Sequence, residues 1–214
     1  MKSIRTIAAA YALAVAGAVL AAPAPVLSNF SLDSEGWITV DLFGLTGPGT
    51  VTWDTAGFIA SYDTHKWNAF SAPAKFLGDK GGFLGGTLSL KLSDSMSDAQ
   101  PNWPVVVITD GAIKLASWPF ASPGSDFTDF SFALDAGSWV KVDSTHPSAS
   151  EFAKVLGGLT GVFVNADFKT SGNDYARLDD VVLTAPVPEP ETYALFLAGL
   201  GVLGVSLGRR RRGA

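Results

Sequence analysis

The chain has 214 residues, a length typical of one domain with appended segments. It contains no cysteine, which excludes a disulfide framework, a cysteine-based zinc site and a thiol nucleophile. Six of its 15 basic residues lie at the two ends, so the region between them sets nine basic residues against all 20 acidic ones. Such a surface repels nucleic acid and anionic membranes, and we expect no nucleic-acid partner.

The first 21 residues have the pattern of a secretory signal peptide. Lys2 and Arg5 form a positive region, and an uncharged apolar stretch follows from Ile7 to Leu20. We predict a signal helix over 1–21 and cleavage after Ala21, because cleavage one residue later would place Pro23 first in the mature chain. This predicts export through the Sec machinery.

The region 28–184 is predicted to be one mainly β domain. Alternation with a period of two places leucines on one face over 87–92 and apolar residues on one face over 130–134. Further β-branched runs cover 103–109 and 176–183, and glycine-rich turns separate these segments. Short strands between turns predict an antiparallel β-sandwich.

One short helix is expected within this domain. In the stretch HPSASEFAKVLGGL, Ser148 is predicted as the N-cap and Glu151 completes a capping box. Phe152 and Val155 then share an apolar face, and Gly157 is suited to end the helix.

The C-terminal end contains three features in a fixed order. A proline-rich linker over 185–191 includes Val187, Pro188, Glu189 and Pro190, and an uncharged apolar run over 192–208 follows it. We predict a transmembrane helix for this run. The basic tail 209–214, with Arg209, Arg210, Arg211 and Arg212, is expected to stop in the cytoplasm under the positive-inside rule.

This arrangement resembles the PEP-CTERM sorting signal of Gram-negative bacteria. The resemblance implies recognition by exosortase, a membrane protease-like enzyme that is thought to cut near the Pro-Glu-Pro triplet. The protein would then be anchored in the inner membrane before processing, and would lie at the cell surface or outside the cell afterwards. An ordinary single-pass anchor is the alternative interpretation.

A second resemblance covers about 150 residues and is carried by the stretch WNAFSAPAKFLGDKGGFLGGTLSLKL at 67–92. Together with NFSLDSEGW near the start, FTDFSFAL in the middle and ARLDDVVL at the end, it is similar to the laminin B domain, also called laminin IV. The resemblance implies a jelly-roll sandwich. The sequence departs from the family pattern at Phe83-Leu84-Gly85-Gly86, and it has no flanking cysteine-rich modules, so laminin-style network assembly is not expected.

No catalytic constellation is evident. The two histidines, His65 and His146, lie far apart in sequence, and no motif of a serine hydrolase, a zinc protease or a phosphate-binding loop occurs. We therefore expect a non-catalytic module, and the two resemblances, with the location that they imply, suggest that it contacts exopolysaccharide. A structural surface protein that binds other proteins, and an unrecognised carbohydrate-active enzyme, are the alternatives.

Two sets of residues are candidate binding sites. Trp103 and Trp118 are flanked by prolines and turn residues, which favours a surface platform for glycan, whereas Trp37 and Trp139 are expected in the core. Asp33 and Asp180 belong to the opening and closing segments of the domain, and a structural calcium ion between them is the second hypothesis. No other cofactor is expected.

Overall fold

The computed structural model describes residues 22–44, 47–96, 103–118, 122–169, 174–187 and 199–200. The predicted signal peptide with Ala21, nearly all of the predicted transmembrane helix and the arginine tail lie outside these residues. Among the described residues, no helix is long and apolar enough to cross a membrane.

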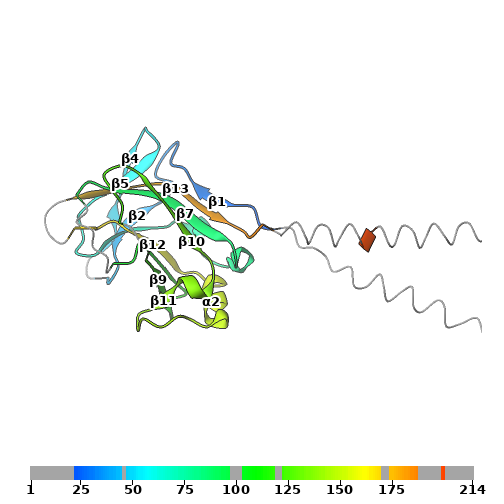
Figure 1. Ribbon diagram of the computed structural model, residues 1–214. Helices are drawn as coiled ribbons and strands as arrows, with labels where there is room; N and C mark the ends of the chain where they lie inside the picture. The colour runs from blue at the N-terminus through cyan, green and yellow to red at the C-terminus, as the bar shows by residue number, and fades with distance from the viewer. Residues whose placement is uncertain are drawn as a thin grey trace, which may run out of the picture.

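Two antiparallel sheets pack face to face (Figure 1). The first sheet has the order β10-β7-β13-β5-β4, with β1 also paired to β13. Its strands are β1 (Val26–Ser28), β4 (Thr52–Asp54), β5 (Phe58–Tyr62), β7 (Thr87–Asp94), β10 (Thr128–Ala133) and β13 (Tyr175–Thr184). Strands β7 and β10 contain the two segments in which alternation was clearest in the sequence, and β13 contains the predicted β-branched run 176–183.

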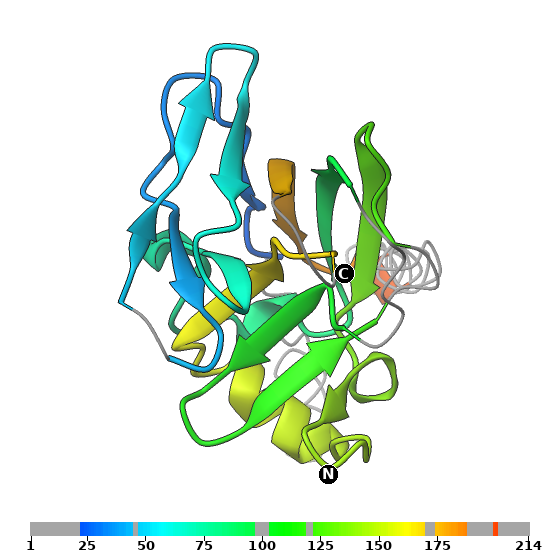
Figure 2. The same ribbon diagram turned by 90° about the vertical axis from the view of Figure 1, so that its left-hand side faces the viewer.

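The second sheet has the order β11-β9-β8-β12-β6-β2-β3. Its strands are β2 (Ile38–Asp41), β3 (Gly49–Thr50), β6 (Asn68–Ser71), β8 (Val106–Thr109), β9 (Lys114–Ser117), β11 (Val140–Lys141) and β12 (Gly161–Asn165). In Figure 2 the green strands β8 and β9 and the yellow strand β12 of this sheet face the viewer. The expectation of a mainly β antiparallel sandwich is confirmed.

Short helices cover the edges and one end of the sandwich. They are the 3-10 helices η1 (Ala74–Phe76), η2 (Gly81–Phe83) and η3 (Ala136–Ser138), and the α-helix α2 (Ala149–Leu156). The predicted capping box is present, since the Ser148 side chain accepts from the Glu151 backbone and the Glu151 carboxylate accepts from the Ser148 backbone. Gly157 ends the helix, as the sequence predicts.

The core lies between the sheets and is filled by apolar residues from both of them. Trp37 and Trp139 are buried there, and the indole N–H of each finds an oxygen: Ser28 Oγ at 2.9 Å and the Ala133 carbonyl at 2.8 Å. The prediction that these two tryptophans belong to the core is confirmed.

Both ends of the described domain leave the sandwich side by side. Val26 of β1 pairs with Leu183 of β13, so the chain enters and leaves at the same place, as Figure 1 shows. We call this the exit end. The opposite end, called the far end here, contains Tyr62 and Tyr175 of the first sheet and Asn165 of the second.

Gly86 marks a close approach of two backbones at the exit end. A Cβ atom built on Gly86 would lie 1.9 Å from the carbonyl oxygen of Thr184, the last residue of β13. No side-chain rearrangement relieves a clash with backbone, so β7 and β13 must separate to admit any other residue.

We therefore expect Gly86→Ala to lower the free energy of unfolding by about 1–3 kcal/mol, the usual cost of overpacking. Chemical denaturation of the variant measures this. Gly47→Ala is the matched control, because a Cβ there meets no atom within 4 Å. Equal stability of the two variants would contradict the close approach.

Candidate functional site

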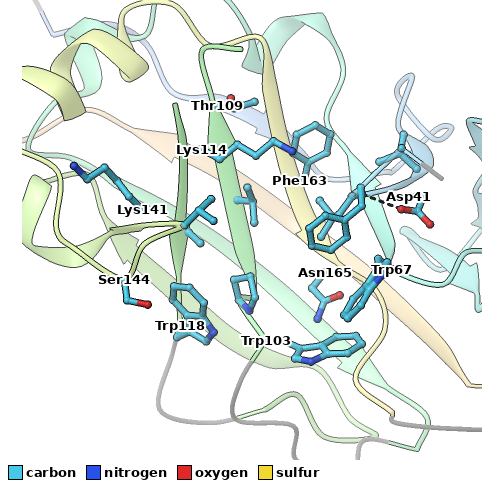
Figure 3. Close-up of a pocket in the computed structure, with 18 of the residues that line it drawn as sticks. Asp41, Trp67, Trp103, Thr109, Lys114, Trp118, Lys141, Ser144, Phe163 and Asn165 are labelled. Atoms are coloured by element: carbon cyan, nitrogen blue, oxygen red, sulfur yellow. Dashed lines mark hydrogen bonds between the residues drawn. The ribbon is translucent and has the colours of Figure 1, made fainter. Parts of the chain in front are cut away.

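A groove of about 830 Å³ lies on the outer face of the second sheet. Its floor consists of outward side chains of β8, β9 and β12, among them Val107, Ala116 and Phe163, and its walls are the segments after β2 and around β11 (Figure 3). Its lining is mainly apolar, which is typical of small-molecule and glycan sites.

Aromatic rings gather in this groove at the far end of the sandwich. Trp67 packs against Trp103 with ring centroids 4.5 Å apart and against Phe43 with centroids 5.1 Å apart. Trp118 lines the same groove beside Trp103, and it is 41% exposed. The two tryptophans predicted as a surface platform are therefore brought to one groove, with Trp67 beside them.

The antiparallel register explains why these rings meet. Trp67 directly precedes β6, Trp103 precedes β8, and Trp118 directly follows β9. Because β6 and β8 both pair antiparallel with β12, and β8 pairs antiparallel with β9, these three strand ends lie at the same end of the sheet. Trp67 and Trp118, which are 51 positions apart in the sequence, therefore lie on one surface.

Polar groups are few in the groove. The loop that holds Phe43 is fixed by Asp41, whose Oδ1 accepts the Phe43 backbone N–H at 2.8 Å. Lys141 forms an ion pair with Glu151 at 3.5 Å, while Lys114 extends along the floor toward Phe163. Asn165, Thr109 and Ser144 add hydrogen-bonding groups to the lining.

Of the described residues that line the groove, Asp41 alone carries a carboxylate. Its side chain is buried and engaged with the loop. Glycoside hydrolysis requires two carboxyl groups that flank the scissile bond. The described lining therefore contains aromatic rings that can stack on a ligand and polar groups that can orient it.

The two histidines are not part of this arrangement. His146 lies in the turn before α2, where its Nδ1 is 2.8 Å from the Trp139 carbonyl oxygen. His65 is in the loop between β5 and β6, is buried and lies 3.5 Å from the Thr39 hydroxyl. Neither histidine lines the groove.

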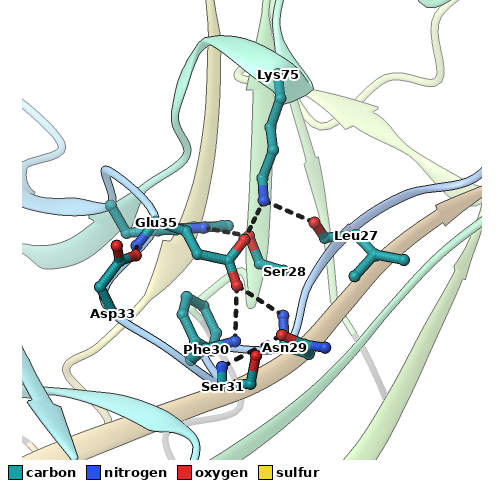
Figure 4. A network of polar contacts seen from close by, with 9 residues as sticks. Leu27, Ser28, Asn29, Phe30, Ser31, Asp33, Glu35 and Lys75 are labelled. Carbon is teal, nitrogen blue, oxygen red and sulfur yellow. Dashed lines mark hydrogen bonds and ion pairs between the residues drawn. The ribbon is translucent and has the colours of Figure 1, made fainter.

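The predicted calcium ligands have other partners. Asp33 accepts the backbone N–H of Glu35 at 2.6 Å, and Asp180 forms an ion pair with Lys91 at 2.7 Å. Figure 4 shows the contacts around Glu35, whose carboxylate binds the ammonium group of Lys75 and the backbone N–H groups of Asn29 and Phe30. Calcium at Asp33 and Asp180 stays a prediction.

The same network has an electrostatic consequence. Partial burial works against the ionised form of Glu35, but the hydrogen bonds from Lys75 and from the Phe30 backbone outweigh it and lower the pKa of this carboxyl. Lys75 also donates to the Leu27 carbonyl at 2.7 Å. The ammonium group of Lys75 therefore links the backbone of β1 at Leu27 to the carboxylate of Glu35.

The sorting residues lie at the exit end or beyond it. Val187 is the last residue of the described stretch 174–187, and it is exposed. Pro188, Glu189, Pro190 and Arg209 to Arg212 lie outside the described residues. The segment that contains the Pro-Glu-Pro triplet thus begins at the end of the sandwich opposite to the aromatic rings.

Comparison with known proteins adds two family matches. The model of the laminin B domain (domain IV) matches residues 69–195, and the model of the PEP-CTERM protein-sorting motif matches residues 186–212. A search of the curated proteins gave no match.

Among solved structures, the L4b domain of human laminin alpha-2 matches with a TM-score of 0.63 at 14% identity. The match covers 77% of this chain and 97% of the laminin chain. The N-terminal cellulose-binding domain of a Cellulomonas fimi β-1,4-glucanase has a TM-score of 0.39 at 14% identity, with 78% and 98% covered. A family 11 carbohydrate-binding module of Clostridium thermocellum has a TM-score of 0.38 at 13% identity, with 78% and 89% covered.

The sandwich, the matched motifs and the shared fold agree with one another. The laminin B match spans more than half of the chain, and the match to the sorting motif overlaps its end over 186–195 and continues to 212. The likeness to the human domain establishes the common fold at low identity. The chain belongs to the laminin B (domain IV) family and carries a PEP-CTERM protein-sorting motif.

Proposed function

We propose that this chain is an exported surface or matrix protein whose laminin B domain binds exopolysaccharide, without catalysis, in the groove of the second sheet. The sorting motif indicates a protein that exosortase sorts to the surface. Before processing, the chain is held in the inner membrane by its apolar C-terminal run. Export uses the Sec machinery and the N-terminal signal peptide.

The observation that carries the binding proposal is the cluster of Trp67, Trp103 and Trp118 in one groove. An indole ring presents a large, rigid and weakly polar face, and such faces stack on the C–H patches of sugar rings. The exposed part of Trp118 and the tilted pair of Trp67 and Trp103 offer at least two such faces to one chain of sugars.

The position of the cluster suits a tethered protein. Strand β13 has ten residues and therefore spans about 33 Å from the far end to the exit end. Its last residue is followed within a few positions by the sorting motif. A chain attached through its C-terminal segment consequently holds the rings at the end that points away from the attachment.

The proposal also states that the groove does not hydrolyse the glycan. The described lining provides a single carboxylate, Asp41, and that side chain holds the Phe43 loop. Hydrolysis of a glycosidic bond would need a second carboxyl group at about 5–10 Å from the first. Binding without cleavage is the function that this lining supports best.

We expect Trp118→Ala and Trp103→Ala each to weaken binding of the exopolysaccharide about tenfold, which corresponds to about 1.4 kcal/mol for one stacked ring. Retention on immobilised exopolysaccharide from the producing cells, followed by titration, measures this. Tyr175→Ala is the matched control, since this exposed ring belongs to the other sheet and should leave affinity unchanged.

Unchanged affinity in both tryptophan variants, with the wild-type protein still retained, would place the binding surface elsewhere. If the wild-type protein is not retained at all, the binding proposal fails and a protein partner becomes the better explanation of the groove. Release of reducing sugar during the incubation would show that the module is an enzyme.

The sorting proposal predicts that Glu189→Ala blocks processing and keeps the full tail on the protein, because the altered triplet is no longer recognised. Intact mass of the protein from the membrane and from the medium measures this. Glu191→Ala is the matched control, being the next acidic residue and lying outside the triplet. Equal processing of both variants, or a wild-type protein that keeps Arg209 to Arg212, would contradict the proposal.

A further inference from the structure

The far end of the sandwich contains carboxylates between the two sheets. On β7 the inward row of Leu88, Leu90 and Leu92 continues to Asp94, because alternate residues of a strand share a face. Asp94 pairs with Ala176 of β13, and Asp174 precedes Ala176 by two positions, so both acidic side chains prolong rows that face the interior.

These side chains are buried and short of partners. Asp94 is 1% exposed and Asp174 is 3% exposed. One oxygen of Asp94 accepts the Met96 backbone N–H at 3.0 Å, but its Oδ2 and both carboxylate oxygens of Asp174 are buried without a hydrogen-bond partner. Three carboxylate oxygens therefore lack the donors that buried polar groups normally have.

One amide oxygen close to this region is also buried without a hydrogen-bond partner. Asn68 Nδ2 donates to Ser61 Oγ at 2.8 Å and lies 3.4 Å from the Ala166 carbonyl oxygen, while Asn68 Oδ1 is buried without a partner. Ser61 pairs with Ala176, the residue that also pairs with Asp94. The orphaned amide oxygen thus belongs to the same end of the interior as the two carboxylates.

Burial without donors is costly for an ionised carboxylate. Burial and the nearby charges of Asp174 and Asp167 raise the pKa of Asp94 to about 7, although the Met96 N–H opposes the shift. Asp63, whose backbone N–H donates to the Asp174 carbonyl at 3.3 Å, has its pKa raised by burial and by Asp174, while His65 lowers it. Negative charge therefore accumulates at this end.

The ion pairs of the described residues do not relieve this charge. They join Lys75 to Glu35, Lys91 to Asp180 and Lys141 to Glu151, and none of them involves Asp94 or Asp174. Either a proton or a cation must neutralise the pair of carboxylates. At neutral pH a divalent cation does so more completely, since it can engage several orphaned oxygens at once.

We infer that the far end binds a calcium ion, with Asp94 and Asp174 as its carboxylate ligands. Ca²⁺ takes six to eight oxygen ligands in adaptable geometry, including amide and backbone carbonyl oxygens and water. The described residues contain no group of three or more Asp, Glu, His or Cys side chains arranged for a metal, so Asn68, backbone oxygens and water complete the shell. Mg²⁺, which demands a near-ideal octahedron, fits this set less well.

This site is separate from the glycan groove and does not depend on it. It lies between the sheets, whereas the groove lies on the outer face of the second sheet. It also differs from Asp33 and Asp180, which already have the backbone N–H of Glu35 and the ammonium group of Lys91 as partners.

The raised pKa of Asp94 determines how the free energy of unfolding of the metal-free chain changes with pH. Without calcium, the folded chain holds a proton on Asp94 up to about pH 7 that the unfolded chain releases near its ordinary value of 3.8. The free energy of unfolding therefore falls as pH rises through this window. Calcium binds the ionised form, so its stabilising effect must grow between pH 5 and pH 8.

The test uses the full-length chain in detergent, stripped with EDTA, and thermal unfolding in 1 mM CaCl₂, 1 mM MgCl₂ or no metal. We expect calcium to raise the midpoint by roughly 5 °C or more at pH 8, as for a ligand well above its Kd, and much less at pH 5. Magnesium should have a smaller effect. Asp94→Asn and Asp174→Asn should lose the calcium shift, while Asp129→Asn, at an exposed position of β10, should keep it.

A midpoint that calcium leaves unchanged at pH 8 in the wild-type chain would overturn the inference and leave a shared proton as the explanation. A shift that persists in Asp94→Asn and Asp174→Asn would overturn it as well. Titration calorimetry of the wild-type chain is the second measurement and needs no variant. One calcium ion should bind per chain, and a wild-type chain that binds no calcium at millimolar concentration would contradict the assignment.

Discussion

The pairing of β13 with β7 is the constraint on which the other features depend. Strand β13 lies in the middle of its sheet, with β7 on one side and β5 and β1 on the other. Its inward residues Leu178 and Val181 are fully buried in the core. The strand also sets the two ends apart, since it begins beside the buried carboxylates and ends against Gly86, just before the sorting motif.

This geometry separates the sorting motif from the aromatic groove. The chain ends leave together where β1 meets β13, and the aromatic rings of the second sheet lie at the opposite end. The sandwich suits such a division because β13 runs without interruption from the far end to the exit end. Processing of the tail can therefore proceed without disturbing the groove.

The proposed calcium ion and the groove occupy the same end for a physical reason. Strand ends and the segments that join them have fewer ladder hydrogen bonds than strand centres, so they need additional contacts to hold a binding surface in place. Asn68 adjoins Trp67 in sequence and supplies one of the orphaned oxygens inside. A cation between the sheets would thereby hold in place the backbone that carries the Trp67 ring.

Local patterns in the sequence determined the strand alternation of 87–92 and 130–134, the capping box of Ser148 and Glu151, and the sorting motif, because each depends on neighbours within a few residues. Trp103 and Trp118 were identifiable from their prolines, yet Trp67 and Phe43 were not, since only antiparallel pairing across the second sheet brings them together. The pair Asp94 and Asp174, 80 positions apart, could not be distinguished from the other acidic residues. Their burial exists only once β7 and β13 are in register, and that long-range pairing is a property of the tertiary structure.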